Sequence, residues 1–110
     1  MTNGKSDFII VLATFSSEEE AENIIQQALD EKLIACANII PQVNSFFRWN
    51  GQISNEKESM AMMKTRHKLF SELKNLIAGL HSYDIAEIIA LPLVDGSEEY
   101  LTWLQNETKD

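Results

Sequence analysis

The chain has 110 residues, of which 45% are hydrophobic and 24% charged, values typical of one soluble globular domain. Its formal net charge is −8, with nine Lys and Arg against seventeen Asp and Glu. Because nucleic acids and anionic membranes attract clustered basic residues, this balance argues against both as partners. The single cysteine, Cys36, excludes an intramolecular disulfide and a CxxC-type zinc site.

The first elements are predicted from the N-terminal part of the chain. Residues 1–6 are polar and predicted to be flexible, and the continuous apolar run 8–15 is typical of a central strand. That run is too short to span a bilayer and lacks the flanks of an export signal, so we expect a cytoplasmic protein. A helix over 16–33 follows, with Ser16 and Glu19 matching a capping box.

A long hairpin is predicted in the middle of the chain. Residues 34–49 favour a strand interrupted at Pro41, which cannot donate a ladder hydrogen bond and indicates a bulge or an edge position. Asn50 and Gly51 form the strongest short hairpin signal. The return strand covers 52–65, with its second part more buried than its acidic first part.

The remaining elements complete an alternating order. Residues 67–81 predict a second amphipathic helix, 87–94 a further buried strand, and Ser97 begins a short C-terminal helix. The order β-α-β-β-α-β with an extra helix predicts an α+β, ferredoxin-like sandwich, in a single domain over 7–107.

Aromatic residues near the hairpin turn predict self-association. The hairpin is too long for two helices to cover, so its end would expose aromatic side chains and unpaired strand edges. A closed oligomer covers both. The predicted interface residues are Phe46, Phe47, Trp49 and, on the last helix, Trp103.

Several segments resemble the CutA family of divalent-cation tolerance proteins. They are VLATFSSEEEA, EKLIACANIIPQVNSFFRWNGQI, MKT at 63–65, HSYDIAEIIALPL and GSEEYLTWL, and together they span most of 8–104. The resemblance implies a homotrimer of ferredoxin-like subunits, a cytoplasmic role and no catalytic reaction. It also implies a likeness to the PII signalling trimers, which suggests ligand sensing at clefts between subunits.

This sequence departs from the family pattern at its most polar motif. The usual H-P-Y-E-x-P-E reads HSYDIAE here, with Ser82 and Ala86 in place of the prolines. Because each missing proline frees the unfolded chain, we expect a less rigid loop. Some relatives carry a copper-binding cysteine and histidine where this chain has Ala13 and Leu80. Only His81 remains of that set.

The residues around this motif support several interpretations. Imidazole and carboxylates bind Cu²⁺ or Zn²⁺, so His81 is the candidate metal ligand, together with acids nearby. In a structural interpretation His81 caps the preceding helix and Tyr83 packs at a subunit boundary. A third interpretation is a cleft for a small anion or metabolite. The candidate cleft residues are His81, Tyr83, Asp84, Glu87, Lys64 and Cys36.

Two of these candidates also have plain structural interpretations. Lys64 can meet an anion or pair with Glu87. Cys36 stands between two alanines and is expected to pack as a small buried hydrophobe, since no cationic neighbour activates its thiol.

The sequence carries no catalytic signature such as GxSxG, HExxH or a P-loop. We therefore expect a non-enzymatic homotrimer that takes part in divalent-cation tolerance, requires no cofactor and binds Cu(II) or another divalent cation weakly. The alternatives are a PII-like sensor of a small metabolite and a trimeric scaffold.

Overall fold

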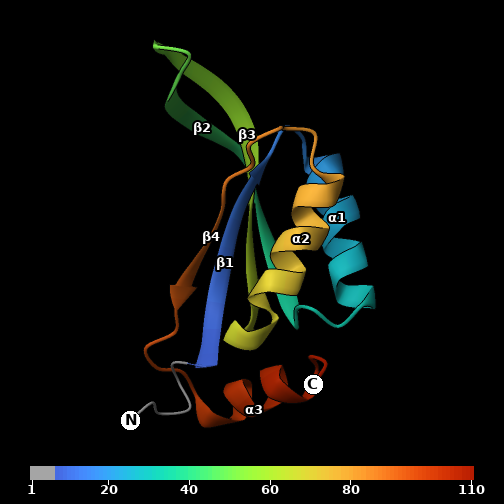
Figure 1. The fold of residues 1–110 in the computed structure, drawn as a ribbon. Helices are drawn as coiled ribbons and strands as arrows, with labels where there is room; N and C mark the ends of the chain where they lie inside the picture. Colours follow the sequence, from blue (N-terminus) through green and yellow to red (C-terminus); the bar gives the residue numbers. More distant parts are fainter. Residues whose placement is uncertain (1–6) are drawn as a thin grey trace.

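A computed structural model describes residues 7–110, and the segment 1–6, predicted to be flexible, lies outside them. In chain order the elements are β1 (Phe8–Phe15), α1 (Glu18–Asp30), β2 (Cys36–Trp49), β3 (Gln52–Arg66), the 3₁₀ turn η2 (His67–Leu69), α2 (Phe70–Leu80), β4 (Ile88–Pro92) and α3 (Glu98–Asn106). The described strands form one antiparallel sheet in the order β2-β3-β1-β4. This arrangement confirms the α+β class (Figure 1).

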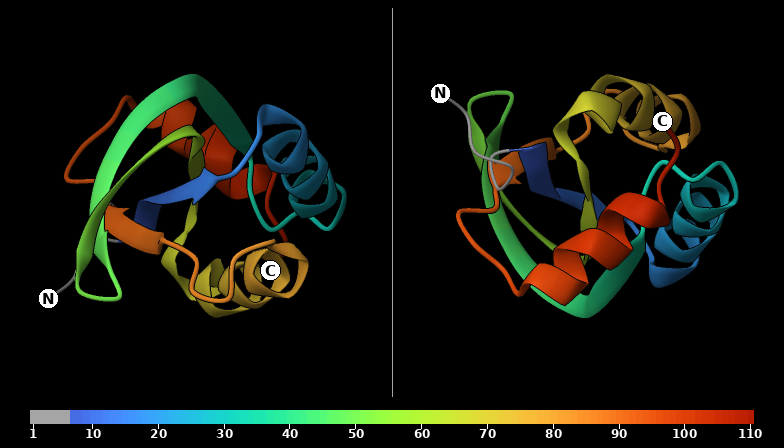
Figure 2. Two further views of the ribbon diagram at one scale, coloured as in Figure 1. Left: turned by 90° about the horizontal axis from the view of Figure 1, so that it is seen from above. Right: turned by 90° about the horizontal axis from the view of Figure 1, so that it is seen from below.

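The core lies between one face of the sheet and the pair of helices α1 and α2 (Figures 1 and 2). Alternate residues of β1, namely Val11, Ala13 and Phe15, are fully buried against the helices, as the period of two in a strand requires. The apolar stripes of α1 and α2 pack onto them. The most buried helix residues are Ala21, Ile24, Ala28, Leu73 and Ile77.

Helix α1 begins one residue later than the capping-box pattern predicts. Ser17 is the N-cap, and its side chain accepts a hydrogen bond from the backbone N–H of Glu20 at 3.1 Å. The prediction of Ser16 and Glu19 is therefore wrong by one position. Two overlapping Ser-x-x-Glu patterns occur in this stretch, and spacing alone does not separate them. Ser16 instead donates its backbone N–H and hydroxyl to the Glu20 carboxylate.

The hairpin turn and the bulge are where the sequence places them. The β2–β3 register shifts between Ile40 and Val43, which confirms the interruption at Pro41 on an edge strand. Asn50 and Gly51 have φ values of 52° and 78°. Positive φ at both central residues is the requirement of a type I′ turn, so the Asn-Gly signal is confirmed.

The far half of the hairpin extends beyond the rest of the sheet. The last pair between β1 and β3 joins Phe15 and Ser59, so the part of β3 nearer the turn pairs only with β2. This projecting arm is visible at the top of Figure 1 and contributes to a longest dimension of 43 Å, against 22 Å for the shortest. The predicted long hairpin is confirmed.

Strand β4 is shorter and more exposed than predicted. It covers Ile88–Pro92 and pairs only with β1, at the edge of the sheet. In the single chain, Ile89 and Leu91 are 49% and 47% exposed. The prediction of a buried strand over 87–94 is wrong for an isolated copy, because no helix covers the outward face of this strand.

The sheet face away from α1 and α2 is apolar and largely uncovered. Ile40, Ile89 and Leu91 alternate with core-packed neighbours and point to this face, each at least 45% exposed. Helix α3 crosses only the end of the sheet (Figure 1). Such a continuous apolar surface on a soluble protein indicates a protein interface.

Candidate functional site

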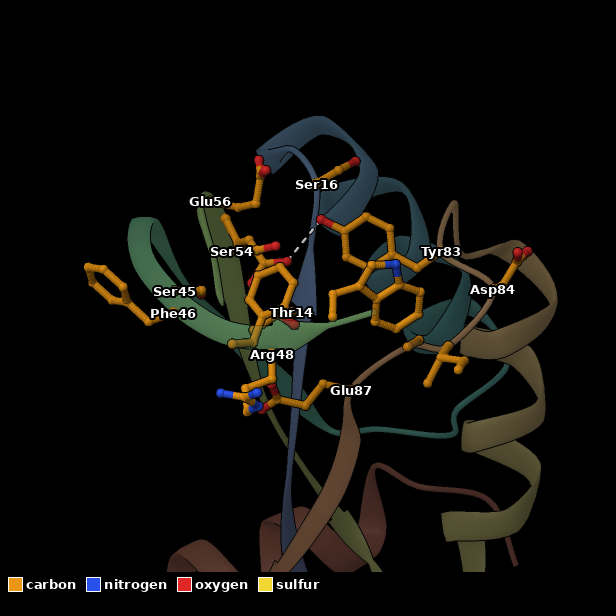
Figure 3. A pocket seen from close by; sticks show the side chains of 15 residues that line it. Thr14, Ser16, Ser45, Phe46, Arg48, Ser54, Glu56, Tyr83, Asp84 and Glu87 are labelled. Carbon is orange, nitrogen blue, oxygen red and sulfur yellow. Dashed lines mark hydrogen bonds between the residues drawn. The ribbon is translucent and has the colours of Figure 1, made fainter. Parts of the chain in front are cut away.

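A cleft of about 900 Å³ lies between the projecting arm and the loop that leads from α2 to β4 (Figure 3). The end of β1 forms its floor, and the arm and the loop form its walls. Its lining includes several acids, aromatic residues and hydroxyls: Thr14, Ser16, Ser45, Phe46, Phe47, Arg48, Trp49, Ser54, Glu56, Glu58, Tyr83, Asp84, Ile85, Ala86 and Glu87.

Tyr83 joins the two walls of the cleft. Its hydroxyl donates a hydrogen bond to Glu58 Oε2 at 2.9 Å, the dashed line in Figure 3. Burial, together with the hydrogen bond to Glu58 and its negative charge, raises the pKa of Tyr83 to about 12. Tyr83 therefore stays protonated and serves as a donor at neutral pH.

His81 occupies the C-terminal boundary of α2, and its ring is held on both sides. Its Nδ1 accepts the backbone N–H of Tyr83 at 3.0 Å, and its Nε2 lies 2.7 Å from the carbonyl oxygen of Thr14. Because Nδ1 accepts, a neutral ring carries its proton on Nε2 and donates it to that carbonyl. The ring also stacks on Phe15, with centroids 5.0 Å apart. His81 thus fixes the start of the loop to β1.

A second contact ties the same loop to α1. The Glu20 carboxylate accepts the backbone N–H of Ser82 at 2.7 Å and also bonds to Ser16. Burial by itself raises the pKa of Glu20, but the hydrogen bonds from Ser82 and Ser16 outweigh it and the net pKa lies below its usual range. These side-chain bonds anchor the first residues of the loop to α1.

Asp84 and Glu87, two of the candidate cleft residues, both line the cleft. Glu56 and Glu58 add two further carboxylates from β3, while Arg48 is the single basic residue in the lining. The cleft is therefore net acidic and disfavours small anions, one of the ligand classes that the sequence left open.

Lys64 and Cys36 lie away from the cleft of their own chain. They are direct partners across β2 and β3, and the Lys64 ammonium donates to the Asn38 side chain rather than to Glu87. Cys36 Sγ lies 3.1 Å from the Tyr100 hydroxyl on α3. That contact with the thiol, together with burial, raises the pKa of Tyr100 to about 12. One chain thus places three of the six predicted cleft residues, Tyr83, Asp84 and Glu87, in the lining of the cleft, with His81 next to Tyr83 but outside the lining.

The described residues of one chain do not form a metal centre. Over 7–110, no group of three or more His, Cys, Asp and Glu side chains is placed to hold a metal ion. Coordination through His81 would also displace one of its two hydrogen bonds. Metal ligation through His81 within a single copy therefore does not fit this arrangement.

The predicted interface aromatics are exposed in the single chain. Phe46 is 68%, Trp49 48% and Phe47 38% exposed on the arm, while Trp103 is 41% exposed on α3 beside Tyr100. Phe47 and Trp49 also line the cleft. Their part in an interface stays a prediction.

Several cleft residues were missed from the sequence, and four of them matter for its charge and hydrogen bonding. Thr14, Arg48, Glu56 and Glu58 come from three strands, and only the strand pairing brings them near the loop. The only local sequence feature that points to these residues is the acidic first half of the return strand. Such a pattern is also typical of an ordinary solvent-exposed strand.

Comparison with known proteins identifies the family. The family model described as "CutA1 divalent ion tolerance protein" matches residues 9–107. The chain belongs to the CutA1 family. A divalent-cation tolerance protein CutA of Thermus thermophilus is 40% identical over 90% of this chain and 96% of its own length. The corresponding protein of Pyrococcus horikoshii is 46% identical over 92% and 98%.

The CutA1 fold also agrees with a solved structure. The divalent cation tolerance protein of Thermus thermophilus superposes with a TM-score of 0.91 at 39% identity, covering 93% of this chain and 99% of the other. Within residues 7–110, no helix has the length and apolar character needed to cross a membrane.

Proposed function

We propose that this CutA1 chain acts as a non-enzymatic, cytoplasmic homotrimer of ferredoxin-like subunits that takes part in divalent-cation tolerance through weak copper binding. The strand order, with two helices on one face, supports the ferredoxin-like description. The names of its relatives describe cation tolerance and state no reaction.

The observation that carries the trimer is the uncovered apolar face of the sheet. Ile40, Ile89 and Leu91 are 45–49% exposed in one copy, in line with the exposed aromatics of the arm. An edge strand at each side of the sheet adds unpaired backbone groups. Packing copies around this face buries the apolar side chains and pairs the edge strands. Closed symmetry also prevents the copies from assembling into an open filament.

Copper binding in this proposal draws its ligands from more than one copy. A single chain offers carboxylates at the cleft and an engaged His81, and Cu²⁺ favours nitrogen and oxygen ligands. Isothermal titration calorimetry with CuCl₂ on the wild type and His81→Ala tests this part. We expect measurable but weak binding that the variant reduces; identical isotherms for both proteins would remove His81 as a ligand.

A second candidate function is sensing of a small metabolite, and the cleft itself favours it. A volume of about 900 Å³ lies within the range of small-molecule sites, and polar groups converge on apolar walls there. A bound ligand should raise the melting temperature by mass action. A broad metabolite screen with no shift in melting temperature would count against this function.

A further inference from the structure

We propose that Thr108 and Lys109 form a clasp that holds α3 closed across the end of the sheet. When the clasp releases, α3 opens as one unit while the sheet and the helices α1 and α2 stay folded. Such a device works within one copy and does not depend on the proposed assembly or on a ligand.

Helix α3 has little apolar contact of its own with the body of the protein. Of its nine residues, Glu98–Asn106, only Leu104 is buried. Leu104 also lies outside the core cluster between the sheet and the helices α1 and α2. The helix runs across the end of the sheet instead (Figure 2). Because a helix this short is marginal in water without packing, its closed position needs further contacts.

The two clasp residues supply these contacts at three points of the body. Thr108 is only 6% exposed, and its hydroxyl oxygen accepts a hydrogen bond from Arg66 Nε, at the end of β3, at 3.0 Å. The Arg66 guanidinium also donates to the Lys109 carbonyl. The backbone N–H of Lys109 donates to the Lys32 carbonyl, just after α1, at 2.9 Å. The Lys109 ammonium lies 2.8 Å from the Glu72 carboxylate in the first turn of α2.

One hydroxyl couples the clasp to the helix itself. Thr108 Oγ1 lies 3.1 Å from the Leu104 carbonyl and 3.2 Å from the Gln105 carbonyl. It therefore donates its proton to the last turn of α3 while it accepts from Arg66. Carbonyls in the last turn of a helix lack an intrahelical donor, so this bond closes the end of α3. Since the same hydroxyl makes both bonds, α3 and the clasp form one unit of local unfolding.

The segment between β4 and α3 is placed to act as the hinge. Residues 93–97 are irregular, and Val94 is 82% exposed. A few residues in such a connection absorb the change in φ and ψ when an element moves. Opening about this segment carries Tyr100, whose hydroxyl lies 3.1 Å from Cys36 Sγ, away from β2. Closure of the clasp therefore also fixes the contact between α3 and β2.

Hydrogen exchange of the full chain, followed by mass spectrometry, tests the clasp. Arg66→Met removes the guanidinium but keeps an apolar stem, and should speed exchange of the amides over 98–109 by roughly tenfold or more, since a hydrogen bond from a charged group contributes about that factor. Thr108→Val keeps the shape and removes both hydroxyl bonds, so it should act in the same direction. The amides of β1 and α1 should keep their wild-type rates.

Two matched controls separate the clasp from charge and composition. Lys68→Met removes the same charge from an exposed position close to Arg66, and Thr102→Val makes the same exchange on the exposed side of α3. Both should leave exchange over 98–109 unchanged. Wild-type exchange in Arg66→Met and Thr108→Val would show that the clasp does not hold α3. Equal acceleration in α3, β1 and α1 would show that α3 does not open separately. Either result would overturn the proposal.

Discussion

The hydrogen bond between Tyr83 and Glu58 gives the sharpest test of the cleft geometry. The chain has two tyrosines, so a Tyr100→Phe background leaves Tyr83 as the only phenol to titrate. In that background Tyr83 should titrate near pH 12 rather than at its usual value near 10, because burial and Glu58 both oppose the phenolate. Absorbance of the phenolate in the near ultraviolet measures this directly.

Glu58→Gln in the same background should lower the Tyr83 pKa by about one unit, because the charge is lost while burial remains. Glu22→Gln is the matched control and should leave it unchanged. Since the folded-state pKa is raised, the stability that Tyr83 contributes is present below pH 10 and is lost as the pH rises towards 12. A Tyr83 pKa that stays the same in Glu58→Gln, or that is ordinary in both proteins, would refute this geometry.

Three further changes probe the interface, the loop anchor and the core. Leu91→Lys places a charge on the uncovered sheet face and should shift sedimentation-velocity profiles to smaller species; an unchanged profile would argue against that face as an interface. Glu20→Gln should lower the melting temperature at neutral pH by weakening the Ser82 anchor, and the difference should shrink as the pH falls through the depressed pKa of Glu20. An equal difference at all pH values would contradict it. Thr65→Val removes the buried 2.6 Å hydrogen bond to the Leu33 carbonyl and should reduce the free energy of unfolding in urea by about 1–2 kcal/mol; no change would show that water replaces the donor.

Much of the fold could be predicted from local patterns. The continuous apolar run of β1 and the Asn50-Gly51 turn agree with the structure because each depends on a short-range rule. The start of α1 was placed one residue early because Ser16 and Ser17 satisfy the same pattern. The exposure of β4 could not be predicted, since its apolar composition is that of a strand covered on both faces, whereas its outward face is uncovered in the single chain.

The site was predicted only where its residues are close in sequence. Tyr83, Asp84 and Glu87 lie on one loop, and all three line the cleft. Glu58 and Thr14 depend on the β1–β3 register, which the sequence does not reveal. Lys64 pairs with Asn38 on the neighbouring strand, a cross-strand contact that spacing along the chain cannot indicate.

The mass of the protein in solution tests the central claim, that copies of this chain close around the uncovered sheet face. Sedimentation equilibrium at micromolar concentration should give a mass three times the 12.5 kDa of one chain. A stable mass of one chain under these conditions would contradict the account.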